Sequence, residues 1–241
     1  MNKLFDLIAK ALYFLRHRPI NIYDPFVNIV KTCVPGWLDQ GHLYCFDYAI
    51  KNLKSDAPIL EIGAYCGLST CVISHYKRKH NKLNKLISVD TWSFEDSKNS
   101  MYAKEANYEL ESIQSFVLDS YKKNVNFFSK EDLPTAVHTT SDDFFDKVKK
   151  REQIECVIGE PILKPIEKIS FAFIDGNHTY PFVKRDFENV DKLLEIGGFL
   201  LFDDSADYLG WGSCKVAKEV SKNPNYKLII QNPNYFFEKI K

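Results

Sequence analysis

The sequence predicts an α/β fold in which a mostly parallel sheet carries helices on both faces. From Pro58 onward, short apolar strands alternate with helical segments, which is typical of a doubly wound sheet. A turn containing glycine follows the first of these strands, and several strands end on an acidic residue. The chain has 241 residues, of which 45% are hydrophobic, so it can bury one sizeable core.

The first fifty residues lack this alternation. Apolar residues from Leu4 to Leu15 recur at helical spacing, and residues 44–53 show a second helical pattern. We therefore expect residues 1–50 to form a helical extension that serves as a lid or in homodimerisation. Residues 51–241 are expected to form the main domain, with an insertion at about 91–135.

The elements of the main domain follow from apolar runs and their end signals. Strands are predicted at Ile59–Leu60, Lys85–Val89, Val137–Thr139, Ile169–Ile174 and Phe199–Phe202. Helices are predicted at Leu68–Lys79, from near Phe144, and at Phe182–Leu194, where Gly197 and Gly198 are read as the stop signal. A polar helical stretch is expected from about Met101 to Lys123 within the insertion.

The last thirty residues break the parallel pattern. Tyr226–Ile230 and Tyr235–Ile240 are strand-like runs separated by Asn232, Pro233 and Asn234. A connection this short joins only antiparallel neighbours. The sheet is therefore expected to close with an antiparallel hairpin.

The turn after the first strand indicates a cofactor site. Gly63 and Gly67 allow the backbone to turn tightly and to approach a ligand without a Cβ in between. A dinucleotide site favours a middle glycine for the pyrophosphate, and this sequence has Tyr65 there. Asp90 ends the second strand, where an acid accepts both hydroxyls of a ribose. A cofactor without phosphate fits these residues better than a nicotinamide dinucleotide.

The segment EIGAYCGLST, from Glu61 to Thr70, resembles motif I of the class I methyltransferases. The resemblance implies a Rossmann-like seven-stranded sheet of order 3-2-1-4-5-7-6 with an antiparallel last strand. It also implies S-adenosylmethionine as the cofactor. The residues expected to bind it are Glu61, Gly63, Ala64, Tyr65, Gly67, Ser69, Asp90, Trp92, Ser141, Asp142 and Asp175. Two roles stay open: Ser141 and Asp142 contact adenine or cap a helix, and Trp92 lies beside the adenine, lines the pocket or packs in the core.

Acidic residues follow two further strands. Asp175 comes after one apolar strand, and Asp203 and Asp204 come after the next. If these strands are neighbours, three carboxylates converge at the sheet edge where ligands of open α/β sheets bind. Such a group repels itself unless a cation lies within it, and oxygen ligands suit Mg²⁺, with Ca²⁺ or Mn²⁺ as alternatives.

The segments IDGNHTY and FLLFDD resemble the DGxHxY and DD pattern of metal-dependent small-molecule O-methyltransferases. This group includes enzymes of macrolide sugars and relatives of cephalosporin hydroxylases. The resemblance implies that Asp175, Asp203 and Asp204 ligate the metal and that His178 is the catalytic base, with Asp175 also catalytic. The simpler interpretation, that the acids cap a helix and that His178 is an ordinary loop residue, stays open.

The expected function is metal-assisted O-methylation of a small molecule such as a sugar or another secondary metabolite. The 32 basic and 32 acidic residues balance, so no global field favours nucleic acid. Scattered cysteines without a CxxC pair and the absence of a continuous apolar segment favour a cytoplasmic protein without a membrane span. Two alternatives are a methyltransferase-like protein that binds the cofactor without transferring methyl and a nicotinamide-dependent oxidoreductase.

Overall fold

A computed structural model of the chain describes residues 7–8, 11–12, 20–93 and 110–241. Most of the predicted helix from Leu4 to Leu15 lies outside the described residues, as does the first part of the predicted helix from Met101. Among the described residues, no helix is both long enough and apolar enough to cross a membrane.

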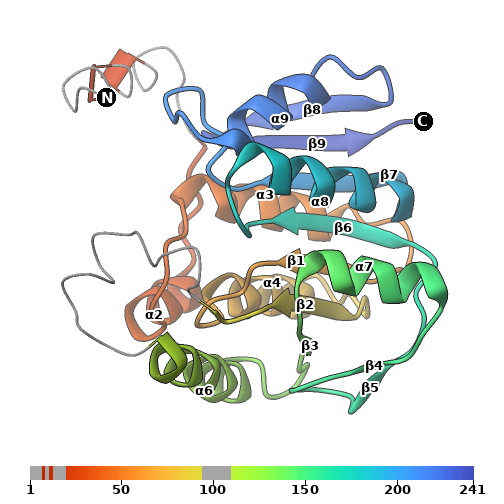
Figure 1. The fold of residues 1–241 in the computed structure, drawn as a ribbon. Helices are drawn as coiled ribbons and strands as arrows, with labels where there is room; N and C mark the ends of the chain where they lie inside the picture. The colour runs from red at the N-terminus through yellow and green to blue at the C-terminus, as the bar shows by residue number, and fades with distance from the viewer. Residues whose placement is uncertain (1–6, 9–10, 13–19, 94–109) are drawn as a thin grey trace.

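The described residues form one large sheet and one small one (Figure 1). The large sheet has seven strands in the order β3-β2-β1-β6-β7-β9-β8, which is the predicted order once the small sheet is left out of the numbering. Its strands are β1 (Ile59–Ile62), β2 (Leu86–Asp90), β3 (Thr135–His138), β6 (Ile169–Ile174), β7 (Leu194–Phe202), β8 (Tyr226–Gln231) and β9 (Tyr235–Lys239). Neighbouring strands pair in parallel along β3-β2-β1-β6-β7. Strand β9 is antiparallel to both its neighbours, as expected.

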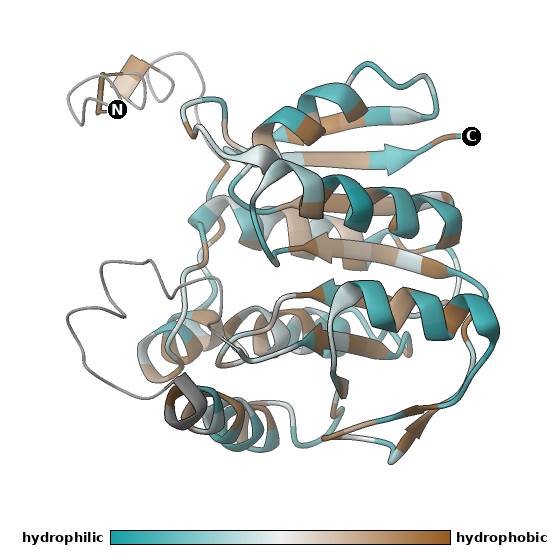
Figure 2. Cartoon of the chain, in the orientation of Figure 1, coloured by the Kyte–Doolittle hydropathy of each residue, from teal (hydrophilic) through white to brown (hydrophobic). Residues whose placement is uncertain are grey.

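Helices cover both faces of this sheet. One layer consists of α2 (Pro25–Cys33), α3 (Gln40–Lys51), α4 (Leu68–Lys79) and α6 (Leu110–Phe128), and the other of α7 (Ser141–Lys150), α8 (Tyr180–Leu193) and α9 (Gly212–Val220). Side chains alternate along β6, with Phe171 and Phe173 packing in the first layer and Ala172 and Ile174 in the second. Figure 2 shows the central strands largely brown between helices that expose teal surfaces. The helices α2 and α3 therefore share a core with the sheet.

Two predicted boundaries are wrong for local reasons. Gly197 and Gly198 do not end a helix, because β7 begins at Leu194, directly after α8. Gly197 has φ +83° inside the strand, close to where the β6–β7 register shifts. The helix predicted from near Phe144 begins at Ser141, after the N-cap Thr140.

The helix cap at Thr140 settles one open alternative. Its hydroxyl accepts a hydrogen bond from the backbone N–H of Asp143. Ser141 and Asp142 thus lie in the first turn of α7 and do not cap it. The short hairpin of β4 (Ile154–Glu155) and β5 (Ile162–Leu163) is not predicted, because its strands are too short to show a periodic pattern.

Candidate active site

The turn between β1 and α4 has a conformation that requires glycine. Gly63 and Gly67 adopt φ +87° and +90°, and Tyr65 between them has φ +44°. A Cβ added to Gly63 would lie 2.0 Å from the backbone oxygen of Asp175, so the turn touches the backbone that follows β6. At Gly67 an added Cβ would meet Val125 of α6 at 3.0 Å.

Asp90 holds this turn from the end of β2. Its Oδ2 accepts hydrogen bonds from the backbone N–H groups of Ala64 at 2.7 Å and Tyr65 at 2.9 Å. Its Oδ1 accepts from the backbone N–H of Trp92 at 2.7 Å. The carboxylate therefore lies beside the turn, where the sequence places it, and remains partly exposed.

Glu61 has a different place from the one predicted. Its side chain is fully buried, and it accepts hydrogen bonds from the hydroxyls of Ser69 (2.5 Å), Thr70 (2.6 Å) and Ser88 (2.6 Å). Burial raises the pKa of Glu61 to about 6, against the lowering effect of these hydroxyls. The prediction that Glu61 contacts the cofactor is therefore wrong for its side chain, because the carboxylate and the Ser69 hydroxyl brace the turn from inside the core.

Two side chains hold the carbonyl groups of the turn. The indole Nε1 of Trp92 donates to the backbone oxygen of Tyr65 at 2.8 Å, and Asn124 Nδ2 of α6 donates to that of Cys66 at 2.9 Å. The Trp92 ring is 1% exposed and lies against Tyr121, with centroids 5.0 Å apart. Of the alternatives for Trp92, the structure supports packing behind the turn. The sequence carries no signal for Asn124, because α6 belongs to the insertion.

Ser141 and Asp142 lie at the same edge of the sheet, beyond β3. The carboxylate of Asp142 accepts from Arg185 Nε at 3.2 Å and from Nη2 at 3.0 Å. Ser141 is hydrogen-bonded to Asp186, whose pKa is raised to about 6 by burial. Any contact of Asp142 with an adenine group must therefore compete with the ion pair to Arg185.

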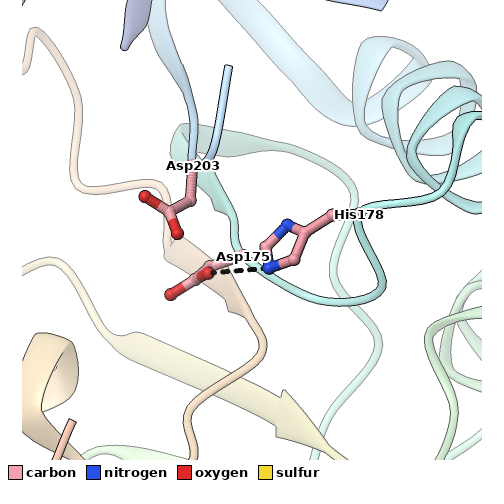
Figure 3. A group of neighbouring side chains, drawn as sticks. All are labelled: Asp175, His178 and Asp203. Atoms are coloured by element: carbon pink, nitrogen blue, oxygen red, sulfur yellow. Dashed lines mark ion pairs between the residues drawn. The ribbon is translucent and has the colours of Figure 1, made fainter. Parts of the chain in front are cut away.

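Three side chains converge where β6 and β7 end (Figure 3). Asp175 follows β6, Asp203 follows β7, and the two strands pair in parallel up to Ile174 and Phe202. Asp175, His178 and Asp203 each offer a ligand atom, and all three atoms lie within 4.8 Å of one another.

Asp204 has a separate position beside His178. It lies outside the group of three and has φ +48°. Its Oδ2 is 3.6 Å from His178 Nε2, which is also 4.0 Å from Asp175 Oδ1. The structure thus brings together two of the three predicted metal ligands and the predicted base, and it places the third acid next to that base.

Like charges dominate this group. Burial raises the pKa of Asp175 well above its usual value, and the neighbouring Asp203 carboxyl raises it further. Burial and the charge of Asp203 also raise the pKa of Asp204, while His178 opposes this effect. Carboxylates held so close together are stabilised in their charged form by a cation. Two facing carboxylates offer oxygen ligands that Mg²⁺ or Mn²⁺ accepts.

The sequence also gave no indication of two further residues at this site. His42 of α3 has Nε2 at 3.2 Å from Asp203 Oδ1, and Asn234 of the β8–β9 turn has Nδ2 at 3.5 Å from the same oxygen. They come from distant parts of the chain, so no motif links them to Asp203.

A seven-stranded sheet of this order, with a glycine turn after β1 and acids after β2 and β6, defines a class I methyltransferase, the class that uses S-adenosylmethionine. Residues 60–205, which are more than half of the chain, match the model of a family described as a methyltransferase domain. The chain belongs to this methyltransferase family. The family match gives no support to the alternative that the protein is a nicotinamide-dependent oxidoreductase. A search of curated proteins by sequence finds no match.

Solved structures share the fold at low sequence identity. An O-methyltransferase from Bacillus cereus in complex with SAH has a TM-score of 0.58 and 12% identity, and the match covers 100% of both chains. The O-methyltransferase TomG from Streptomyces achromogenes, in complex with SAM, has a TM-score of 0.53 and 11% identity over 95% of both chains. A SAH-bound methyltransferase from Podospora anserina has a TM-score of 0.55 and 12% identity, covering 100% of this chain and 97% of the other. At such identities the likeness concerns the fold.

Proposed function

We propose that this protein transfers the methyl group of S-adenosylmethionine to a hydroxyl oxygen of a small molecule, with the help of a divalent cation. The observation that carries the proposal is the close approach of Gly63 to the backbone of Asp175. Through this contact the glycine turn and the acidic group become two walls of one site. A cofactor on the turn and a hydroxyl beside the acids are then neighbours, as in-line transfer requires.

The turn fits S-adenosylmethionine on the residues present. Gly63 lets the turn pack directly on the backbone of Asp175, and Asp90 offers a partly exposed carboxylate beside the turn, suited to ribose hydroxyls. We further propose that Ala64, Tyr65 and Gly67 contact the cofactor, and that Ser141 and Asp142 lie near its adenine. The SAM- and SAH-bound structures with the same fold support this placement.

The acidic group fits a divalent cation. We propose that Asp175 and Asp203 hold it, because their carboxylates face each other and share one group with His178. When bound, such a cation lowers the pKa of a hydroxyl in contact with it and orients that hydroxyl. Asp204, predicted as a ligand from the sequence, is better placed to orient His178.

His178 is proposed as the base. Its Nε2 faces the acidic group and takes the proton of the acceptor hydroxyl, and the nearby carboxylates of Asp175 and Asp204 stabilise the resulting imidazolium. The hydroxyl oxygen forms a bond to the methyl carbon as the bond from sulfur to that carbon breaks. The products are the methyl ether, S-adenosylhomocysteine and a proton on His178.

We propose a small-molecule acceptor such as a sugar or another secondary metabolite. TomG, which shares the fold, is described as involved in tomaymycin synthesis. The insertion at about 91–135, the N-terminal helices and residues 205–213 are proposed to form the lid and the acceptor pocket. A cytoplasmic location is proposed as well, since all six cysteines are free thiols.

Binding and turnover test the proposal separately. Calorimetry should show binding of S-adenosylhomocysteine but not of NAD. In a screen of hydroxylated small molecules, release of S-adenosylhomocysteine should require an added divalent cation, stop with EDTA and resume with excess Mg²⁺. Turnover that persists after complete chelation would exclude the cation. Cofactor binding without transfer to any acceptor would favour the non-catalytic alternative.

The hydrogen bond from Asn124 gives a further prediction. Replacing Asn124 with Ala frees the Cys66 carbonyl, and one such bond is worth about 1 kcal/mol net. Because the loosened turn must become ordered on binding, we expect S-adenosylhomocysteine to bind up to about five-fold more weakly. Asn126→Ala is the matched control, since the Asn126 amide bonds the Lys122 carbonyl on the exposed side of the same helix. Equal calorimetric affinities of the two variants would contradict the role of Asn124.

A further inference from the structure

His42, in the first turn of α3, is a wholly buried residue in contact with the acidic group. Its relative exposure is 0%, and its ring packs against Phe46 and Phe173, at centroid distances of 5.9 and 5.5 Å. Its Nε2 lies 3.2 Å from Asp203 Oδ1. A helix outside the matched methyltransferase region thus reaches the site.

Asn234 determines what this imidazole nitrogen is able to do. Asn234 Oδ1 accepts hydrogen bonds from the backbone N–H groups of Ser205 at 2.7 Å and Ala206 at 3.1 Å, which fixes the orientation of the amide. Its Nδ2 therefore faces His42 Nε2, at 2.9 Å. Nδ2 only donates, and it also bonds Asp39 Oδ2 at 3.0 Å, so His42 Nε2 either accepts from Asn234 or donates to Asp203 Oδ1. Only the second arrangement places a hydrogen bond from His42 on the carboxylate.

The other ring nitrogen of His42 is costly for the fold. His42 Nδ1 is buried and has no hydrogen-bond partner among the described residues. An unsatisfied buried polar atom costs about 1–3 kcal/mol. A phenylalanine would fill the same space beside Phe46 and Phe173 without that cost. Packing alone therefore does not explain a histidine at this position, whereas contact with Asp203 does.

The backbone around His42 is held by the β8–β9 turn. Asn232 Oδ1 accepts from the Ile20 backbone N–H at 2.9 Å, and its Nδ2 donates to the Ile20 oxygen at 2.8 Å. Asn232 Nδ2 also donates to the Gly41 oxygen at 3.3 Å. A Cβ on Gly41 would lie 1.6 Å from the backbone oxygen of Asn232, so the first turn of α3 packs directly on the β8–β9 turn. These contacts fix the imidazole relative to Asp203.

We infer that His42 is a positioning residue, which holds the Asp203 carboxylate in the orientation that binds the cation. The inference rests on the proposed function, because it assumes a cation between Asp175 and Asp203. Carboxylates that hold a metal are themselves usually hydrogen-bonded, and loss of such a partner typically lowers metal affinity by about 10–100-fold. His42 and Asn234 occupy the Oδ1 atom of Asp203, and the Asp203 carboxyl also bonds Asp175.

Mn²⁺ binding to the full-length protein, measured by electron paramagnetic resonance, tests this role directly. His42→Phe keeps the ring packing and removes both nitrogens, so we expect Mn²⁺ affinity to fall about ten-fold or more. The melting temperature should change little, because removal of the unpartnered Nδ1 offsets the loss of the Nε2 contact. His42→Gln places an amide near the position of Nε2 and should keep most of the affinity.

Two controls separate positioning from general damage. S-adenosylhomocysteine affinity should be unchanged in His42→Phe. His75→Phe alters another histidine that pairs with an acid, Asp24, and stacks on an aromatic ring, and it should leave Mn²⁺ affinity unchanged. Wild-type affinity for Mn²⁺ in His42→Phe, or a lower melting temperature with parallel loss of both ligands, would overturn the inference alone. If the wild-type protein binds no Mn²⁺, the proposed cation is refuted together with this role.

Discussion

Replacing Asp175 with Asn should lower methyl transfer by about a thousand-fold or more while leaving S-adenosylhomocysteine affinity nearly intact. Cation assistance is worth several kcal/mol, and about 1.4 kcal/mol corresponds to a factor of ten in rate. Asp175 lies at the centre of the acidic group, where burial and Asp203 raise its pKa. Removal of its charge relieves repulsion, so the melting temperature should stay constant or rise. Single-turnover kinetics and calorimetry measure the two effects.

Asp146→Asn serves as the control for this variant. Asp146 is an exposed acid of α7, and its replacement should change neither turnover nor binding. Unchanged turnover in Asp175→Asn would rule out the cation mechanism. Loss of cofactor binding together with turnover would indicate instead that Asp175 acts mainly on the cofactor, as its predicted second role suggests.

Replacing Gly63 with Ala should abolish cofactor binding and destabilise the protein by about 3 kcal/mol or more. A left-handed backbone costs a non-glycine residue roughly 1–2 kcal/mol, and overpacking costs about 1–3 kcal/mol. At Gly63 both apply, because φ is +87° and the new Cβ would lie 2.0 Å from the Asp175 backbone oxygen. The glycine turn and the backbone of Asp175 then have to move apart, which separates the proposed cofactor site from the acidic group. Urea denaturation and calorimetry with S-adenosylhomocysteine measure the result.

Gly197→Ala is the matched control for the backbone strain. Gly197 has φ +83°, and its added Cβ would meet only the flexible side chain of Lys54, at 3.0 Å or more. This variant should lose only about 1–2 kcal/mol and keep its cofactor affinity. If Gly63→Ala behaves like Gly197→Ala in both measurements, the contact with Asp175 does not shape the site.

Local signals account for most of what the sequence predicts correctly. Apolar runs identify β6 at its observed bounds, and the helical pattern from Leu68 to Lys79 matches α4. A prediction that depends on a single residue type fails where tertiary structure determines the local conformation. Gly197 resembles a helix stop in the sequence, but its left-handed conformation lies at an irregularity within β7.

The site is predicted where a motif lies next to a strand end. Asp90, Asp175 and Asp203 are found at the expected sheet edge, because parallel strands bring their carboxyl ends together. The motif does not show which of its side chains are buried. Glu61 and Trp92 therefore resemble ligand contacts in the sequence, although both side chains are buried behind the turn. His42 and Asn234 meet only through tertiary contacts, across 192 positions of the chain.

The contacts of Ile20 and Gly41 with the β8–β9 turn have a consequence for the order in which the protein folds. Ile20 and Asn232 are hydrogen-bonded across 212 positions, and Gly41 packs on the same turn. During synthesis, Ile20 and Gly41 leave the ribosome long before Asn232 has been made. Contacts between segments so far apart in the chain form slowly. The contact of His42 with Asn234 therefore forms only after the β8–β9 turn has been synthesised.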